Sequence, residues 1–164
     1  MFREMRRKKQ ALSREECELV LERGTSGVLA VLGEGGYPYA VPLSYVYADG
    51  RIIFHCAKQG HKLDAITEND KVSFCVVDLD DIQPERYTTY FRSVIAFGRA
   101  RVLEEEGEKR AAMEVLAEKY TPGDPEGRKQ EIEKEYRALC VVAVEIDHLG
   151  GKEAIELVKK KKEM

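Results

Sequence analysis

Residues 39–66 read YAVPLSYVYADGRIIFHCAKQGHKLDAI and contain the strongest turn signal in the chain. Asp49 and Gly50 stand between two runs rich in β-branched and aromatic residues, a pattern typical of a two-residue β-hairpin. A type I′ turn needs positive φ at both central positions, and an Asp-Gly pair tolerates this conformation. The segment therefore predicts two antiparallel strands, 38–48 and 51–57, joined at this turn.

The turn also predicts which residues lie opposite each other, because the pairs can be counted outward from it. The predicted pairs are Ala48–Arg51, Tyr47–Ile52, Val46–Ile53, Tyr45–Phe54, Ser44–His55, Leu43–Cys56 and Pro42–Ala57. Directly opposed residues share one face of a sheet. Each face of the hairpin can therefore be assigned from the sequence.

One face is large and mostly apolar, as the interior of a small barrel requires. Its members are Leu43, Tyr45, Tyr47, Ile52, Phe54 and Cys56. The other face carries mainly small side chains around one serine and one histidine: Ala40, Pro42, Ser44, Val46, Ile53, His55 and Ala57. We expect this second face to leave room for a flat ligand, although a plain surface with a solvated histidine would give the same pattern. Pro42 cannot donate to a ladder and marks a sheet edge or a bulge.

A glycine-containing turn follows the hairpin and leads into a helix expected over 60–69. Free N–H groups at a helix N-terminus, together with Lys62 and His61, would suit a phosphate group. A solvated lysine explains the same residues without a ligand, and the helix dipole disfavours a cation there unless an anion is bound.

The remaining sequence predicts a mainly β fold in one domain over residues 1–164. Ser13 and Glu16 form a capping-box pattern that predicts a helix over 13–23, ending at Gly24. The six expected strands are 26–33, 38–48, 51–57, 71–78, 88–103 and 138–147, and further helices are expected at 60–69, 107–119 and 127–136. The tight hairpin, and the absence of a G-x-G-x-x-G motif, favour an antiparallel barrel over a Rossmann sheet.

The composition of the chain argues against nucleic acid, a membrane and a zinc ion as partners. The chain has 27 basic and 30 acidic side chains, a balance that argues against nucleic-acid binding. It has no apolar run long enough for a membrane span and no apolar stretch behind its basic N-terminus, so we expect a cytoplasmic protein. Its cysteines lack the spacing of a zinc site or a redox dithiol and are expected to be reduced and mostly buried: Cys17, Cys56, Cys75 and Cys140.

Three blocks of sequence resemble the pyridoxamine-phosphate-oxidase superfamily, and within it the nitroimidazole-resistance (Nim) proteins. The first is 39–66. The second is 90–102, YFRSVIAFGRARV, where an aromatic-X-Ser-Val segment precedes G-x-A. The third is the Gly-Lys-Glu of 151–153, after the strand that ends at Asp147. The resemblance implies a six-stranded antiparallel split β-barrel with flanking helices, and a homodimer that binds FMN at the subunit interface.

The resemblance also implies which residues meet the cofactor. Val41, Pro42, Leu43 and Ser44 would run beside the flavin ring, opposite His55, Cys56 and Ala57. His61 and Lys62 would meet the phosphate, and Ser93 and Val94 would contribute from the long strand. The chain departs from many relatives at two positions: His61 stands where they have arginine, and Gly150 where they have serine or threonine.

The activity that the resemblance implies is reduction of a nitroaromatic or another small electrophile, with electrons from NAD(P)H or another donor. His55 is the candidate catalytic residue, because an imidazole can donate a proton near neutrality. It could instead only hydrogen-bond Ser44 or the cofactor. Two other functions remain open: a haem protein with His55 or His61 on the iron, and a flavin storage or sensing module without turnover.

Overall fold

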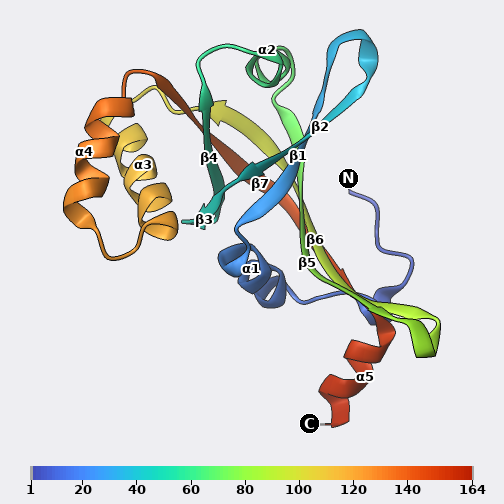
Figure 1. The fold of residues 1–164 in the computed structure, drawn as a ribbon. Helices are drawn as coiled ribbons and strands as arrows, with labels where there is room; N and C mark the ends of the chain where they lie inside the picture. The colour runs from blue at the N-terminus through green and yellow to red at the C-terminus, as the bar shows by residue number, and fades with distance from the viewer. Residues whose placement is uncertain (1, 164) are drawn as a thin grey trace.

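The computed structural model describes residues 2–163 and places one seven-stranded antiparallel sheet among flanking helices (Figure 1). The strands are β1 (Ser26–Leu32), β2 (Pro38–Ser44), β3 (Val46–Ala48), β4 (Arg51–Ala57), β5 (Lys71–Gln83), β6 (Thr88–Val102) and β7 (Leu139–Glu153). The α-helices are α1 (Arg14–Arg23), α2 (His61–Glu68), α3 (Glu106–Tyr120), α4 (Pro125–Glu135) and α5 (Ile155–Glu163). Short 3₁₀ turns lie at η1 (Lys8–Gln10), η2 (Glu34–Gly36) and η3 (Pro84–Arg86).

The predicted strands and helices are all present, but the prediction of six strands is wrong. The run expected at 38–48 is interrupted at Tyr45 and forms both β2 and β3, which gives seven strands. The order is β2-β1-β5-β6-β7-β4-β3, so the sheet is not closed into a complete barrel. β5 and β7 also continue past their expected ends at 78 and 147, and α5 was not expected.

The two edges of the sheet, β2 and β3, are consecutive in the chain. The Asp49-Gly50 turn is confirmed, with φ of 52° and 74°, and β3 pairs with β4 as predicted over the three pairs next to it. At Tyr45 the chain leaves β4, and β2 pairs instead with β1, from Ser44–Ser26 to Pro38–Leu32.

The outer part of the predicted hairpin register is therefore wrong. The pairs that do not form are Tyr45–Phe54, Ser44–His55, Leu43–Cys56 and Pro42–Ala57. The physical reason is competition for the same strand: β1 offers β2 a continuous antiparallel ladder with matching apolar positions, which a local turn rule does not take into account.

The main core lies on the inner face of the curved sheet and confirms the predicted apolar face of the hairpin. Tyr45, Ile52 and Phe54 are fully buried there, and Leu43, Tyr47 and Cys56 pack against them. α1 closes one end of this core with Cys17, Val20 and Leu21. Its capping box forms as predicted between Ser13 and Glu16, and the helix ends at Gly24.

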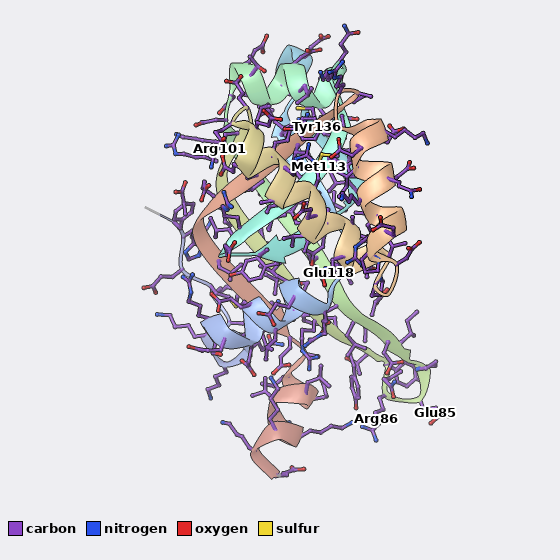
Figure 2. All side chains as sticks on the ribbon, turned by 90° about the vertical axis from the view of Figure 1, so that its left-hand side faces the viewer. Glu85, Arg86, Arg101, Met113, Glu118 and Tyr136 are labelled. Atoms are coloured by element: carbon purple, nitrogen blue, oxygen red, sulfur yellow. The ribbon has the colours of Figure 1, made fainter. Side chains whose placement is uncertain are left out.

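A second apolar cluster lies on the outer face, where α3 and α4 form a helical hairpin against β3, β4 and β7 (Figures 1 and 2). Its buried members are Val46, Ile53, Leu103, Ala112, Met113, Leu116, Ile132, Val141 and Ala143. Val46 and Ile53 were expected on an open face, but the helices cover them. The open part of that face is therefore limited to Ala40, Pro42, Ser44, His55 and Ala57.

The β5–β6 hairpin extends away from the body of the protein, and Glu85 and Arg86 lie at its tip (Figure 2). Across residues 2–163, no helix combines the length and the apolar composition that a bilayer crossing requires.

Candidate functional site

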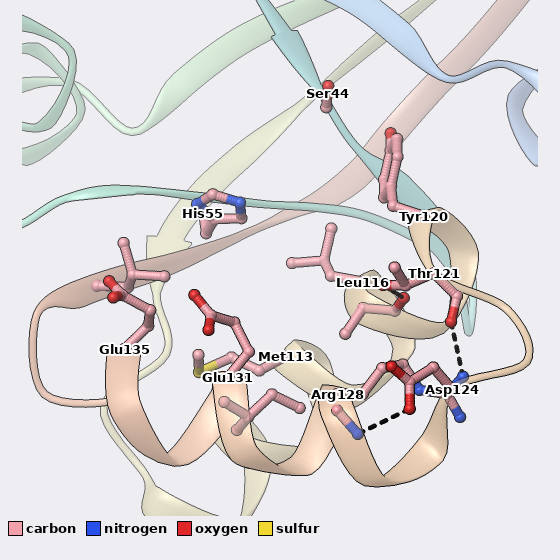
Figure 3. Close-up of a pocket in the computed structure, with 14 residues that line it drawn as sticks. Ser44, His55, Met113, Leu116, Tyr120, Thr121, Asp124, Arg128, Glu131 and Glu135 are labelled. Atoms are coloured by element: carbon pink, nitrogen blue, oxygen red, sulfur yellow. Dashed lines mark hydrogen bonds between the residues drawn. The ribbon is translucent and has the colours of Figure 1, made fainter.

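Ser44 and His55 line the same cavity, although they are not cross-strand partners (Figure 3). The cavity has a volume of about 630 Å³ and lies between the α3–α4 hairpin and the two strands. It exists because β2 turns away from β4 at Tyr45, so that residues 54–57 of β4 pair with β7 on one side and with no strand on the other. Ser44 and His55 thus line the same cavity from two strands that do not pair with each other.

The cavity has an apolar floor and polar walls. Met113, Leu116 and Ala117 come from α3, and Ile132 and Leu139 complete the apolar part. The polar lining residues are Ser44, His55, Tyr120, Thr121, Asp124, Arg128, Glu131 and Glu135. Burying an apolar body while a few polar groups fix its orientation is the usual design of a small-molecule site.

Tyr120, at the C-terminal end of α3, hydrogen-bonds the backbone of Tyr45, the residue between β2 and β3. Its hydroxyl oxygen accepts a hydrogen bond from the Tyr45 N–H at 2.9 Å. The hydroxyl lies 2.7 Å from the Tyr45 carbonyl oxygen and 2.5 Å from that of Thr25, and it donates its proton to one of them. Tyr45 lies between two strands, so this hydroxyl replaces the ladder partners that its backbone lacks.

The side chain of Tyr45 makes its own hydrogen bond and ring contact on the inner face. Its hydroxyl donates to the Leu21 carbonyl at 2.8 Å, and burial raises the pKa of the phenol well above its usual range. Its ring packs edge-on against Phe74, with 5.0 Å between the ring centroids. The bend that opens the cavity is therefore fixed from both faces of the sheet.

The predicted ring-binding residues divide between the two faces. Pro42, Ser44, His55 and Ala57 are exposed on the outer face. The side chains of Val41, Leu43 and Cys56 pack against the core, so only their backbone is available to a ligand on the outer face.

Cys56 lies directly opposite Cys140 on β7. Burial raises the pKa of the Cys56 thiol to about 11, so the group is neutral at physiological pH. The four cysteines are free thiols, buried or half-buried.

The predicted phosphate element lies at the start of α2. Gly60 precedes the helix with φ of 132°, and no side chain within residues 2–163 caps the first turn. The His61 ring stacks on Tyr39 of β2 at 4.2 Å between centroids, and the Lys62 Nζ lies 5.9 Å from the centroid of the Phe54 ring. These contacts hold both basic residues against inner-face side chains of β2 and β4.

Ser93 and Val94 lie elsewhere in the chain. β6 is separated from β2 by β1 and β5, and from β4 by β7. Val94 is fully buried in the main core, whereas Ser93 pairs with Val77 and Lys152. A single chain therefore does not bring these two residues to Ser44 and His55.

Ser93 borders an apolar surface on the outer face of β1, β5 and β6. Val28 pairs with Cys75, and Cys75 pairs with Ile95, which places the three on one face. The large exposed side chains that form this surface include Val28, Val77, Ile95 and Phe97. The Phe2 ring lies against Phe97 at one end of this surface, with 5.5 Å between the ring centroids.

Sequence reasoning missed the α3–α4 wall of the cavity. The helices themselves were predicted, but the apolar face of α3 is one that any packed helix would show, and α4 buries only Ile132. Only the fold reveals that Tyr120 reaches Tyr45, 75 residues away in the sequence.

Comparison with known proteins gives one family match and a set of similar structures. The profile of the pyridoxamine 5'-phosphate oxidase family matches residues 13–153. Among curated proteins, none matches the chain.

The chain is similar to a candidate 5-nitroimidazole antibiotic resistance protein from Bacteroides thetaiotaomicron, with 20% identity, a TM-score of 0.72 and coverage of 87% of this chain and 86% of that one. It is similar to an FAD-binding protein from Mesorhizobium loti, with 26% identity, a TM-score of 0.64 and coverage of 88% and 97%. A third similar structure is an FAD- and haem-binding protein from Mycobacterium smegmatis, with 23% identity, a TM-score of 0.73 and coverage of 89% and 73%.

The profile match extends from the start of α1 to the end of β7 and includes every strand of the sheet. The chain therefore belongs to the pyridoxamine 5'-phosphate oxidase family.

Proposed function

We propose that this protein is a homodimeric FMN-binding flavoprotein that reduces a small electrophile such as a nitroaromatic compound. The observation that carries the proposal is the separation of β2 from β4, which leaves Ser44 and His55 at one cavity, while α2 begins at His61, shortly after β4 ends at Ala57. Family membership supports flavin as the ligand, and the similar protein from Mesorhizobium loti is described as FAD-binding.

The residues along this gap fit FMN. Pro42, Ser44 and Ala57 are small and exposed, so His55 is the one large exposed side chain that a flat ring meets on the outer face of these strands. The uncapped first turn of α2 and Lys62 suit the phosphate, because they offer N–H donors and a positive charge. FMN, when bound, supplies the electron-transfer chemistry, and the chain supplies binding, orientation and exclusion of water.

Within this proposal, His55 and Ser44 act on the substrate side. His55 projects from β4 into the cavity, where its ring N–H can donate a proton to an oxygen of a substrate. The Ser44 hydroxyl lines the same cavity and can orient a polar group of that substrate. The apolar floor of Met113, Leu116 and Ile132 excludes water from the opposite side.

The apolar surface of β1, β5 and β6 is the proposed dimer interface. An uncovered patch of Val28, Val77, Ile95 and Phe97 is costly to leave in water, and a second copy of the chain would bury it. Ser93 borders this surface, so a partner subunit could bring it to a flavin that its own chain does not let it reach.

A haem protein is the second candidate. The similar structure from Mycobacterium smegmatis is described as binding both FAD and haem, and His55 and His61 are exposed imidazoles that could ligate iron. A haem would give a visible spectrum that a flavin cannot produce.

The deciding experiment is the absorbance spectrum of the purified protein, followed by identification of the released chromophore. Flavin bands and released FMN support the proposal, whereas a dominant Soret band supports the haem candidate. Oxidation of NAD(P)H with a nitroaromatic acceptor then tests activity. Bound flavin without turnover would support a flavin storage or sensing module instead of an enzyme.

A further inference from the structure

We propose that the cavity between the α3–α4 hairpin and β4 binds small aromatic molecules that carry a positive charge. The inference rests on the proposed function and deepens it, since it names the class of substrate that would reach His55.

The cavity wall is built from one face of each helix. Met113, Leu116, Ala117 and Tyr120 follow the i, i+3, i+4, i+7 spacing of a helix face on α3. The α4 residues Gly127, Arg128, Glu131, Ile132 and Glu135 follow the same period. The lining is therefore a continuous surface presented by two rigid elements.

The floor suits a flat apolar body. Met113, Leu116 and Ile132 are each less than a tenth exposed and belong to the outer apolar cluster. The volume of about 630 Å³ falls within the usual range of small-molecule sites. A single substituted aromatic ring fits this space and keeps one end next to His55.

The carboxylates of Glu131 and Glu135 supply the charge selectivity. They lie one helical turn apart on α4, and Figure 3 shows both directed toward the strand that carries His55. Their ion-pair partner is Lys134, at 3.3 Å from Glu131 and 3.7 Å from Glu135. Lys134 is 68% exposed, and Glu131 and Glu135 are 63% and 36% exposed, so these ion pairs are weak and leave both carboxylates able to meet a charged ligand.

The other charged residues of the lining are engaged at the far end. Arg128 Nη1 donates to the Thr121 carbonyl at 2.9 Å, and Asp124 accepts from the Gly127 N–H at 2.9 Å. The lining as a whole carries three carboxylates, those of Asp124, Glu131 and Glu135, against the one guanidinium of Arg128, so its formal charge is negative. It attracts an ammonium group and repels a carboxylate at the same position.

Three probes with one ring and different charges test this inference. They are para-nitrobenzylamine, para-nitrobenzyl alcohol and para-nitrobenzoate, which at neutral pH are positive, neutral and negative. Isothermal titration into the purified dimer with FMN gives their affinities. We expect para-nitrobenzylamine to bind about three- to fivefold more tightly than the alcohol, and para-nitrobenzoate to bind most weakly.

Substitutions in the protein distinguish the effect of the carboxylate charge on probe affinity from the effect of the cavity shape. The double variant Glu131→Gln, Glu135→Gln should bring the three affinities within about twofold of one another. Glu126→Gln, on the same helix but outside the lining, should leave the order unchanged. Ala117→Leu should weaken all three probes alike, because it fills the cavity without altering its charge.

Equal affinities in the wild type, a preference for the benzoate, no binding of any probe, or a preference that survives the double substitution would each overturn the inference. Failure of the proposed function would look different. Protein without flavin that still prefers para-nitrobenzylamine would contradict the flavoprotein proposal and support the pocket.

Discussion

His55 is the residue on which the proposed chemistry depends, since it is the one histidine that lines the cavity within the described chain. We predict that His55→Ala lowers turnover per bound flavin about a hundredfold or more, the usual contribution of a general acid. FMN affinity should change much less, because the imidazole acts on the substrate. Steady-state kinetics and a separate FMN titration measure the two effects.

His148→Ala is the control for loss of an imidazole outside the cavity, since that ring stacks on Phe2. Because His148 also pairs with Phe97 of the proposed interface, the oligomeric state of this variant is measured first. The control should leave turnover per flavin unchanged. Loss of FMN binding with normal turnover per bound flavin in His55→Ala would reassign His55 as a contact to the cofactor.

Lys62 distinguishes a phosphate site from a solvated helix start. We predict that Lys62→Ala weakens FMN about ten- to a hundredfold, which corresponds to about 1.5 to 3 kcal/mol for a charge-assisted hydrogen bond. Riboflavin lacks the phosphate, so its affinity should hardly change. Titration of both ligands into apo protein gives the comparison.

Lys71→Ala, which removes an exposed lysine at the start of β5, should affect neither ligand. Wild-type affinity of Lys62→Ala for FMN would mean that the phosphate lies elsewhere.

At the residue scale the sequence predicted the right cavity neighbours for partly the wrong reason. Ser44 and His55 do line one cavity, but the pairing that was to place them together does not form. Alternation along each strand was enough to assign their face, because it depends only on local geometry. Glu131 and Glu135 could not be recognised, since charged residues on an exposed helix are unremarkable until the fold shows what they face.

Among the elements, α3 is fixed to the sheet at both ends, and Tyr120 makes the contact at its C-terminal end. We predict that Tyr120→Phe destabilises the protein by about 1 to 3 kcal/mol, because it leaves the Tyr45 N–H without its acceptor and the carbonyl of Tyr45 or Thr25 without its donor. Urea unfolding followed by circular dichroism measures the change.

Tyr136→Phe removes a more exposed hydrogen bond, to the Glu106 carbonyl, and should cost clearly less. An equal effect of the two substitutions would show that Tyr120 has no special role at the bend.

The N-terminal end of α3 is held by Glu108, which bonds Arg51 on β4 and Arg101 on β6. Arg101 first, and then Arg51, lowers the pKa of Glu108 from its ordinary 4.5 to about 2. A carboxyl whose folded-state pKa is depressed stabilises the fold above its unfolded pKa, and this contribution is lost as the pH falls toward the folded value. We therefore predict that Glu108→Gln is less stable than wild type at pH 7, and that the difference shrinks below about pH 4.5.

Unfolding free energies measured by urea titration between pH 7 and pH 3 test this prediction. Glu104→Gln, a neighbouring exposed carboxyl, serves as the control. A difference that stays constant over that range would contradict the assigned ion pairs.

At the element scale, prediction succeeded where signals are local. The capping box at Ser13 and the Asp49-Gly50 turn both form as expected. The break at Tyr45 was missed because it arises from competition between β1 and β4 for one strand. The extension of β5 was missed because polar residues in a projecting hairpin lack the alternation that identifies a strand, and that of β7 because Gly150 and Gly151 interrupt its apolar pattern.

For the whole molecule, the proposed dimer makes a direct prediction. Ile95→Glu places a charge in the middle of the apolar surface and should yield a monomer that also binds FMN more weakly. Analytical ultracentrifugation at micromolar concentration, with and without FMN, measures the association. Leu19→Glu, at an exposed leucine of α1, should remain dimeric. A wild-type monomer in the presence of FMN would rule out a site shared between subunits.

The two prolines of β2 bear on how the protein avoids aggregation. β2 is an edge strand, and an unpaired edge can recruit a strand from another molecule and start a fibril. Pro38 and Pro42 are four residues apart, so their missing N–H donors lie on the same side of the strand. Proline is tolerated in a paired strand where its nitrogen faces away from the neighbouring strand. The two missing N–H donors therefore lie along the edge of β2 that does not face β1. A strand from another molecule would lack two hydrogen-bond donors along this edge. The two prolines thereby protect the open edge of β2, beside which a ligand is proposed to bind, from amyloid-like growth.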